Sequence, residues 1–312
     1  MCSGTRVVMS LKSTWEDQQA PFVSVVVPVF NSPRRVARCI EALLGQTYPR
    51  DRYEIIVVDN GSTDNTPEVI QRYKVELVVE DRIQSPYAAR NRGIQTARGE
   101  LIALIDANCT PIADWLAHGV QAIQTEQADL AGGKVTFTFS RHQTAGELYD
   151  SITNVNMEQS IARRGVAKGG NLFVKRRVFD AIGLFPSDLR SGGDVLWTGA
   201  ATRAGLKLVY AADAEAFYPA RKLVALLKKQ IRVGRGQIVI WTKQRLSPPT
   251  LALRMVKGLL PPSPWAIRCK LHRRGIRAWS TWLAVWLNGW ACKLATSLGR
   301  IQALTRSREV QR

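Results

Sequence analysis

The residues best suited to chemistry are an acid and an amide that follow one apolar run. Residues 101–105 (LIALI) are apolar, and Asp106 and Asn108 come directly after them. Such a run is typical of a strand buried on both faces of a parallel sheet, and ligands of open α/β sheets bind beyond the carboxyl ends of their strands. The oxygens of Asp106 and Asn108, on one side of an extended segment, suit a divalent cation that holds a diphosphate. Taken alone, the stretch also fits a strand that ends in an Asx turn.

The elements that must position this pair alternate between strand and helix. Apolar runs at residues 23–30, 53–59 and 75–79 predict strands, and Pro33, Thr66 and Pro86 are each placed to begin a helix. Polar groups follow the strand ends, where helix N-termini and turn amides favour anions. This arrangement predicts pyrophosphate or nucleotide binding. The chain has neither a Gly-x-Gly-x-x-Gly turn after its first strand nor a Gly-Lys-Ser/Thr loop, which argues against a dinucleotide-binding Rossmann domain and a P-loop nucleotidase.

Four motifs, in this order and spacing, resemble family 2 glycosyltransferases of the GT-A fold. The resemblance covers roughly residues 21–236. It implies an α/β fold of the GT-A type, a Rossmann-like mixed sheet with helices on both faces, followed by a C-terminal helical tail. It also implies a nucleotide-diphospho-sugar donor. The motifs are residues 25–31 (VVVPVFN), 56–64 (IVVDNGSTD), 89–93 (ARNRG) and 106–108 (DAN).

The resemblance also implies roles for single residues in donor binding. Asp59 would accept a hydrogen bond from the base or ribose, and Arg90 would help to hold the nucleotide. Asp106 with Asn108 would occupy the position of the metal and the ribose diphosphate. Residues 169–186 look like the family segment beside the donor sugar, which predicts donor contacts for Gly170 and Asn171. Taken alone, Asp59 is a turn former and Arg90 a solvated or salt-bridged side chain.

Asp194 is the predicted general base. Residues 192–205 are similar to the family segment that carries a Glu-Asp pair at a helix start. An inverting transfer needs one carboxylate to take the proton of the acceptor hydroxyl, and a metal to offset charge on the leaving group. The competing interpretation is that Asp194 only caps the helix that follows it.

Departures from the family pattern concern the metal site. Asn108 replaces an acid and is a weaker, neutral ligand. Residues 214–219 lack the metal-directed His of many relatives, and Gly193 stands where the Glu would be. The resemblance implies a divalent cation, Mg²⁺ or Mn²⁺. These departures from the family pattern make weak or absent metal dependence the alternative. In that case Arg232 or Arg235 would offset the diphosphate charge.

Charge divides the chain into a body and a tail. Residues 219–312 contain 20 Lys or Arg residues and a single acid, so the whole net charge of +19 lies there. We therefore expect a polar N-terminal extension (residues 1–20), a catalytic domain (residues 21–218) and a basic helical tail (residues 219–312). Such a tail implies a polyanionic partner. The five cysteines are scattered and support neither a disulfide framework nor a zinc site.

The tail also carries an amphipathic pattern. Residues 221–236 read as a basic helix, and the prolines at 248–249 and 261–264 predict a linker. Beyond it, four tryptophans share one face of a predicted helix (Trp279, Trp282, Trp286 and Trp290), and the charge-free span 278–292 has 15 residues. That span is shorter than the roughly 20 residues needed to cross a bilayer, so we expect the helix to lie in an anionic membrane surface. Alternatively, the tryptophans pack on the catalytic body or on another subunit, and residues 221–236 form a solvated basic face.

These features together predict a glycosyltransferase at the cytoplasmic face of the cell membrane, peripheral or monotopic. It would transfer a sugar from a nucleotide-diphosphate donor, with inversion, to a lipid-linked or polysaccharide acceptor. The competing functions are a basic nucleic-acid-binding adaptor and a degenerate glycosyltransferase-like protein without turnover. Nucleic acid is not expected as a partner, because the excess charge is confined to the tail and no recognised nucleic-acid motif is present.

Overall fold

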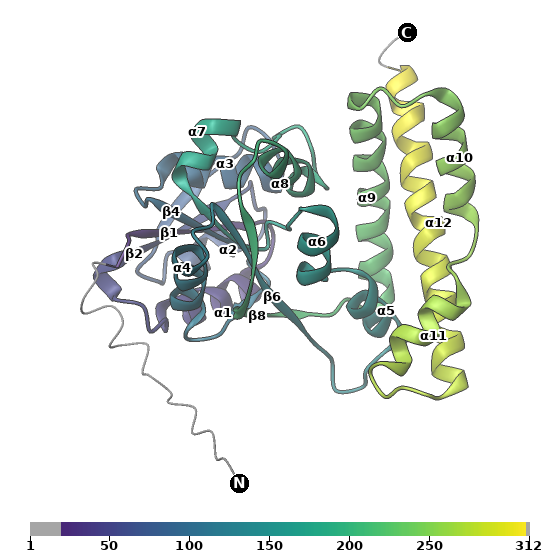
Figure 1. The fold of residues 1–312 in the computed structure, drawn as a ribbon, viewed down its shortest axis with the longest axis horizontal. Helices are drawn as coiled ribbons and strands as arrows, with labels where there is room; N and C mark the ends of the chain where they lie inside the picture. Colours follow the sequence, from purple (N-terminus) through teal and green to yellow (C-terminus); the bar gives the residue numbers. More distant parts are fainter. Residues whose placement is uncertain (1–19, 310–312) are drawn as a thin grey trace.

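The computed structural model describes residues 20–309, so the predicted N-terminal extension lies almost wholly outside the described residues. In this part of the chain eight strands form one mixed sheet in the order β3-β2-β1-β4-β7-β6-β8-β5 (Figure 1). The strands are β1 (Val23–Val29), β2 (Tyr53–Asp59), β3 (Glu76–Val79), β4 (Leu101–Ile105), β5 (Thr110–Pro111), β6 (Leu130–Thr138), β7 (Asn171–Lys175) and β8 (Leu208–Pro219).

Helices cover both faces of the sheet because its central strands are apolar on both sides. Val25 and Val27 pack in one core with α1 (Pro33–Leu44) and α4 (Trp115–Thr125), whereas Val26 packs in the other. The second core includes residues of α3 (Pro86–Thr96), α7 (Arg176–Ile182) and α8 (Gly193–Arg203). The other helices of the body are α2 (Thr66–Ile70), α5 (Ala145–Thr153) and α6 (Met157–Arg164), and a 3₁₀ turn lies at Arg50–Arg52.

The sheet register brings the predicted polar groups to one edge. β1 pairs in parallel with β2, and Val29 lies opposite Asp59; on its other side β1 pairs in parallel with β4. Strand β7 runs antiparallel to β4 and places Asn171 opposite Ile105. The Asp106 N–H donates to the Gly170 carbonyl at 3.3 Å. The site edge therefore joins strand ends from the parallel half with the strand start of β7.

The tail is a bundle beside the α/β body (Figure 1). It consists of α9 (Leu223–Lys243), α10 (Pro248–Leu259), α11 (Pro264–His272) and α12 (Trp279–Glu309). Contrary to the predicted linker, Pro248 and Pro249 begin α10, because proline is well tolerated in a first helical turn. Helix α9 lies along α12. A Cβ atom at Gly234 would lie 2.0 Å from the Thr296 carbonyl oxygen, and one at Gly299 equally close to that of Ile231.

The tryptophan face of α12 is only partly covered within the tail, since Trp279 and Trp290 are 62% and 37% exposed. The indole N–H groups of Trp282, Trp286 and Trp290 donate to the carbonyls of Pro264, Pro262 and Leu259, at 3.1, 2.8 and 3.0 Å. The tail therefore satisfies these three indole N–H groups but leaves Trp279 and part of Trp290 exposed. Other apolar side chains of α12, of α10 and just after α10 are exposed as well, namely Leu287, Leu294, Leu298, Ile301, Leu253, Val256 and Leu260. Within residues 20–309, every helix is too short or too polar to cross a bilayer.

Substitution of Gly234 tests the contact between α9 and α12. Helix propensity alone predicts that Gly234→Ala stabilises α9 by about 1 kcal/mol. The added methyl group would instead collide with the α12 backbone, and overpacking of this kind costs about 1–3 kcal/mol. We therefore expect a lower free energy of unfolding, measured by urea denaturation. Gly45→Ala is the control, since its Cβ would meet the Glu41 carbonyl at an ordinary 3.5 Å; a Gly234→Ala protein as stable as the wild type would contradict the contact.

Candidate functional site

A cleft of about 630 Å³ opens at the site edge of the sheet and is closed on one side by α9. It lies where the carboxyl ends of β1 and β4 meet the loops before β7 and α8, as the apolar runs predicted. The structure thus gathers most of the predicted site in one place. The predicted residues that line the cleft are Arg90, Asp106, Asn108, Gly170, Asn171, Asp194 and Arg232.

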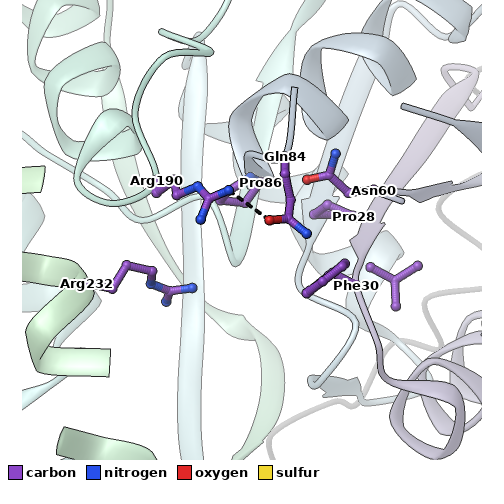
Figure 2. A pocket seen from close by; sticks show the side chains of 8 residues that line it. Pro28, Phe30, Asn60, Gln84, Pro86, Arg190 and Arg232 are labelled. Atoms are coloured by element: carbon purple, nitrogen blue, oxygen red, sulfur yellow. Dashed lines mark hydrogen bonds between the residues drawn. The ribbon is translucent and has the colours of Figure 1, made fainter. Parts of the chain in front are cut away.

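A smaller pocket of about 230 Å³ adjoins this cleft. Figure 2 shows Phe30 and Asn60 on one side of it and Arg190 and Arg232 on the other. The Phe30 side chain is 44% exposed, which leaves a flat apolar surface open to a ring, and Arg190 donates to Gln84 at 2.8 Å. Arg190 was not predicted, and no motif in the sequence marked it. The pocket offers an aromatic surface beside two guanidinium groups, which suits an aromatic ligand that carries phosphate.

Asp59 lies directly beneath this pocket and does not reach the surface of the cleft. It is 3% exposed and accepts a hydrogen bond from the Ser62 N–H at 2.9 Å. Its Oδ1 atom is buried and has no hydrogen-bond partner among the described residues. Its neighbour Asn60 lines the pocket and donates to the carbonyls of Glu80 and Ile83. Asp59 therefore offers one unused acceptor beneath the pocket.

Arg90 and Asp106 form an ion pair on the floor of the cleft. The Arg90 Nη2 atom lies 2.5 Å from Asp106 Oδ1; the arginine is buried, and the Asp106 side chain is 37% exposed. The aromatic ring of Tyr87 also lies 5.6 Å from the guanidinium carbon of Arg90. The ion pair uses Oδ1, and the second oxygen of Asp106, Oδ2, lies beside Gly170. A Cβ atom added to Gly170 would lie only 2.8 Å from that oxygen. Arg90 therefore fixes the acid and contributes a buried positive charge.

The second acid, Asp194, is held by three hydrogen bonds in the first turn of α8. Its Oδ1 atom accepts from the Tyr87 hydroxyl at 3.1 Å and the Val195 N–H at 3.0 Å, and its Oδ2 atom accepts from the Gly169 N–H at 3.0 Å. These bonds fix the orientation of the carboxylate beside the cleft. The position of Tyr87 also explains why residue 193 is a glycine, because a Cβ atom there would lie 2.9 Å from the Tyr87 ring. Tyr87 thus fills the space beside Asp194 that a side chain at position 193 would need.

Asn171, predicted to contact the donor, is committed to the sheet. Its Nδ2 atom donates to the carbonyls of Lys134 and Ala214 at 2.9 and 3.0 Å, and its Oδ1 atom accepts from the Trp115 indole at 2.9 Å. The residue is fully buried. Its amide therefore ties β7 to its neighbours and positions Gly170, and its oxygen already carries a hydrogen bond from Trp115.

The two arginines predicted on α9 point to different places. Arg232 lines the cleft and the smaller pocket. Arg235 donates to the Gln302 side chain of α12 at 2.7 and 3.1 Å and does not line either. The predicted donor contact of Arg235 is therefore not supported by its position in the structure, which gives it a role in packing the tail.

The donor set for a cation consists of one carboxylate and one amide. Among residues 20–309, no group of three or more His, Cys, Asp or Glu side chains is arranged to hold a metal ion. Asp106 and Asn108 both reach the cleft surface, and Oδ2 of Asp106 is not used by the Arg90 pair. Mg²⁺ commonly takes one or two carboxylates and completes its octahedron with substrate phosphates and water. The residues present fit a cation that arrives with a diphosphate, and they do not fit a cation held by protein alone.

Besides Arg190, the cleft region contains further charged residues that were not predicted. Lys168, Arg221 and Lys229 line the cleft wall, and the buried Asp150 pairs with Arg221 and Lys229, in both cases at 3.5 Å. Lys168 directly precedes the Gly-Gly segment and Lys229 lies in the predicted basic helix, so both were within reach of sequence reasoning. No motif marks Asp150.

Comparison with known proteins agrees with this geometry. The family model described as "Glycosyl transferase family 2" matches residues 24–175. Glycosyltransferase AglE of Haloferax volcanii is 43% identical over 298 residues, an alignment that covers 93% of this chain and 98% of that protein. A dolichyl N-acetyl-α-D-glucosaminyl phosphate 3-β-D-2,3-diacetamido-2,3-dideoxy-β-D-glucuronosyltransferase of Methanococcus voltae is 31% identical over 121 residues, 36% of this chain and 37% of that protein.

A solved structure shares the fold. The mannosyltransferase PcManGT of Pyrobaculum calidifontis, in complex with GDP-Man and Mn²⁺, superposes with a TM-score of 0.62 at 20% identity, over 92% of this chain and 88% of that one. The expected GT-A architecture with helices on both faces of a mixed sheet and a C-terminal helical tail is therefore confirmed.

Proposed function

Because this chain belongs to glycosyltransferase family 2 and is a transferase, we propose that it moves one sugar from a nucleotide-diphosphate donor to an acceptor hydroxyl with inversion at the anomeric carbon. The observation that carries this proposal is the convergence of two carboxylates on one cleft. Asp106 directly follows strand β4 and Asp194 lies in the first turn of helix α8, and the backbone of Gly169 and Gly170 lies against both.

The smaller pocket is the proposed nucleotide site. The base would lie against Phe30, and the unused Asp59 acceptor beneath the pocket would receive an N–H of the base or ribose after a small shift of the loop at Asn60. Arg190 and Arg232 would face the diphosphate, because guanidinium groups bind phosphate oxygens in pairs. The nucleotide sugar bound by the Pyrobaculum relative supports a donor of this class.

Asp194 is the proposed general base. Its carboxylate would accept the proton of the acceptor hydroxyl as that oxygen attacks the anomeric carbon opposite the leaving diphosphate. The Tyr87 hydroxyl and the Gly169 N–H hold the carboxylate in place, so little reorganisation is needed during the reaction. Asp106 and Asn108 would hold a divalent cation, Mg²⁺ or Mn²⁺, which would supply positive charge to the leaving diphosphate.

The exposed side of the tail supports attachment to a membrane. Leucines of α10 and α12 are exposed, and the same tail carries exposed basic residues, namely Lys257, Arg268, Arg273 and Arg277. Apolar side chains beside cations are the composition that anionic bilayer surfaces bind. We place the enzyme at the cytoplasmic face of the cell membrane. A lipid-linked or growing polysaccharide acceptor follows from that position, and the lipid phosphate named for the Methanococcus relative agrees with it.

The direct test is a screen of UDP- and GDP-sugars with Mn²⁺ for donor hydrolysis or transfer. We expect at least one donor to be turned over. Asp194→Asn should lower kcat by about 100-fold to 10,000-fold with donor affinity nearly unchanged, because a neutral amide cannot accept the proton. Donor affinity is measured by isothermal titration. Full activity in Asp194→Asn would contradict the assignment of the base, and the absence of nucleotide binding would contradict the donor class.

Gly170→Ala tests the spacing at Asp106. The added methyl group would displace the carboxylate, since its Cβ would lie 2.8 Å from Oδ2. A displacement near 1 Å is expected to lower kcat/KM by about 100-fold with the melting temperature nearly preserved. Gly45→Ala, in an open position of the same domain, should retain wild-type kinetics. Equal kcat/KM for both variants would show that the close approach is unimportant.

The membrane proposal predicts the effect of charge on the outer face of α12. The double variant Leu294→Glu, Leu298→Glu should lose co-sedimentation with phosphatidylglycerol vesicles, because each leucine contributes about 1.5–3 kcal/mol when buried and each new acid is repelled by the lipid. Leu184→Glu, at an exposed leucine of the catalytic body, is the matched control. Unchanged sedimentation of the double variant would exclude this face as the attachment surface.

A further inference from the structure

Three basic side chains lie near one buried acid on the wall of the cleft. Two of them, Arg221 and Lys229, pair with it. Asp150 of α5 is fully buried, and its Oδ2 accepts from the Arg221 N–H at 3.0 Å and lies 3.5 Å from the Arg221 side chain. Its Oδ1 lies 3.5 Å from the Lys229 ammonium but has no hydrogen-bond partner among the described residues. The Lys168 ammonium donates to the Asn154 carbonyl nearby, and Asn154 lies just beyond the end of α5.

Charge in this cluster is unbalanced. Lys168, Arg221 and Lys229 are three basic groups near the single carboxylate of Asp150, and the Lys229 and Arg221 side chains are 15% and 23% exposed. Buried charges are costly unless they are paired. Burial, followed by the charge of Arg221, lowers the pKa of Lys229 to about 7. Burial also lowers the pKa of Lys168. The fold thus holds three basic side chains beside one buried carboxylate, and burial disfavours protonation of Lys229 until an anion binds.

The cluster lines the same cleft as the two proposed site acids, Asp106 and Asp194. Lys168 interacts electrostatically with both Asp150 and Asp194, and Arg221 interacts with both Asp150 and Asp106. All three cations line the main cleft, whereas none of them lines the smaller pocket proposed for the nucleotide. That pocket has its own cations, Arg190 and Arg232. The cluster therefore lines the main cleft outside the proposed nucleotide pocket, and Arg221 is close enough to Arg232 for their charges to interact.

We propose that Lys168, Arg221 and Lys229 form a subsite for a carboxylate or phosphate group carried by one of the sugar substrates. This inference rests on the proposed transferase function and adds the class of substrate, an acidic sugar. The anion would balance the excess charge in hydrogen bonds to two ammonium groups and one guanidinium group. It would also place the acceptor hydroxyl or the anomeric carbon relative to Asp194.

Binding of small acidic probes tests the subsite. Glucuronate, inorganic phosphate and neutral glucose are titrated into the full-length protein by calorimetry, with and without saturating UDP or GDP. We expect glucuronate to bind about tenfold or more tightly than glucose, and Lys229→Met to abolish this preference. Lys228→Met is the control: it removes an exposed charge from the adjacent position of α9 and should retain the preference for glucuronate. Because the probes are also titrated without nucleotide, failure of nucleotide binding would count against the donor proposal alone.

The source of the anion is decided by a second pair of titrations. If UDP-glucuronate binds more tightly than UDP-glucose, and Lys229→Met removes the difference, the acidic sugar is the donor. If the two donors bind equally while free glucuronate still binds to the UDP-loaded protein, the acidic sugar belongs to the acceptor. Two results would overturn the subsite: no preference for glucuronate or phosphate over glucose, or about tenfold weaker binding of UDP itself in Lys229→Met, which would assign the cluster to the diphosphate.

The pH dependence of glucuronate binding reports the charge state of Lys229. It is a second test, which does not depend on the stability of Lys229→Met. Lys229 faces Asp150 of α5, Arg221 after β8, Lys168 before β7 and Cys292 of α12, whose thiol pKa is raised to about 12 by burial. Anion binding favours protonated Lys229, so wild-type affinity for glucuronate should fall as the pH rises from 6 to 8.5. Lys229→Arg keeps its charge throughout and should bind with a much smaller pH dependence. An identical pH dependence in both proteins would contradict the assignment.

Discussion

The backbone of Gly169 and Gly170 passes between two carboxylates, one directly after strand β4 and one in the first turn of helix α8. On one side the Gly169 N–H donates to Asp194, and on the other the Gly170 carbonyl accepts from the Asp106 N–H. Hypothetical Cβ atoms show how tight this passage is, since one at Gly169 would lie 3.3 Å from the Arg90 guanidinium carbon and one at Gly170 would lie 2.8 Å from an Asp106 oxygen. A side chain at position 170 would displace Asp106, and one at position 169 would press on Arg90, the ion-pair partner of Asp106. The spacing of the site therefore depends on two residues that contribute no functional group.

The tail completes the site through the same kind of close contact. Gly234 and Gly299 allow α9 and α12 to approach at backbone distance, and Gly236 faces the loop before α8, where its Cβ would lie 2.8 Å from the Ser191 carbonyl oxygen. These contacts fix the rotation of α9 about its axis. Arg232 and Lys229 consequently face the cleft. A basic helix that reads as a surface feature in the sequence is thus a wall of the proposed active site.

Strand ends were predictable because they depend on local pattern. Apolar runs that stop at a polar residue, followed by a proline or a capping residue, specify where Asp59 and Asp106 lie along the chain and at which edge they meet. The choice between Arg232 and Arg235 was not predictable, because it depends on glycine contacts with a helix that lies far away in sequence. For the same reason the hydrogen bonds of Asn171 with Trp115 and with two distant carbonyls were not predictable.

The tail was the least predictable part. A tryptophan stripe shows that one face of α12 is apolar, but the pattern is the same whether lipid or protein covers that face. In the structure the carbonyls between α10 and α11 accept from the indoles, and the exposed apolar face lies further round the helix. Pairing across long sequence separations also concealed Asp150, which meets Arg221 and Lys229. Charge partners of this kind leave no local signal.

The central claim is that a single carboxylate base, Asp194, acts in one displacement on a donor held at Asp106. The most direct measurement is time-resolved proton NMR of donor turnover, with water or an acceptor as the nucleophile, in which the first-formed product reports the anomeric configuration. A single displacement predicts inversion, so an α-linked donor should give a β product before mutarotation. First-formed product with the configuration of the donor would contradict the claim, because retention through an enzyme-bound sugar requires a second displacement.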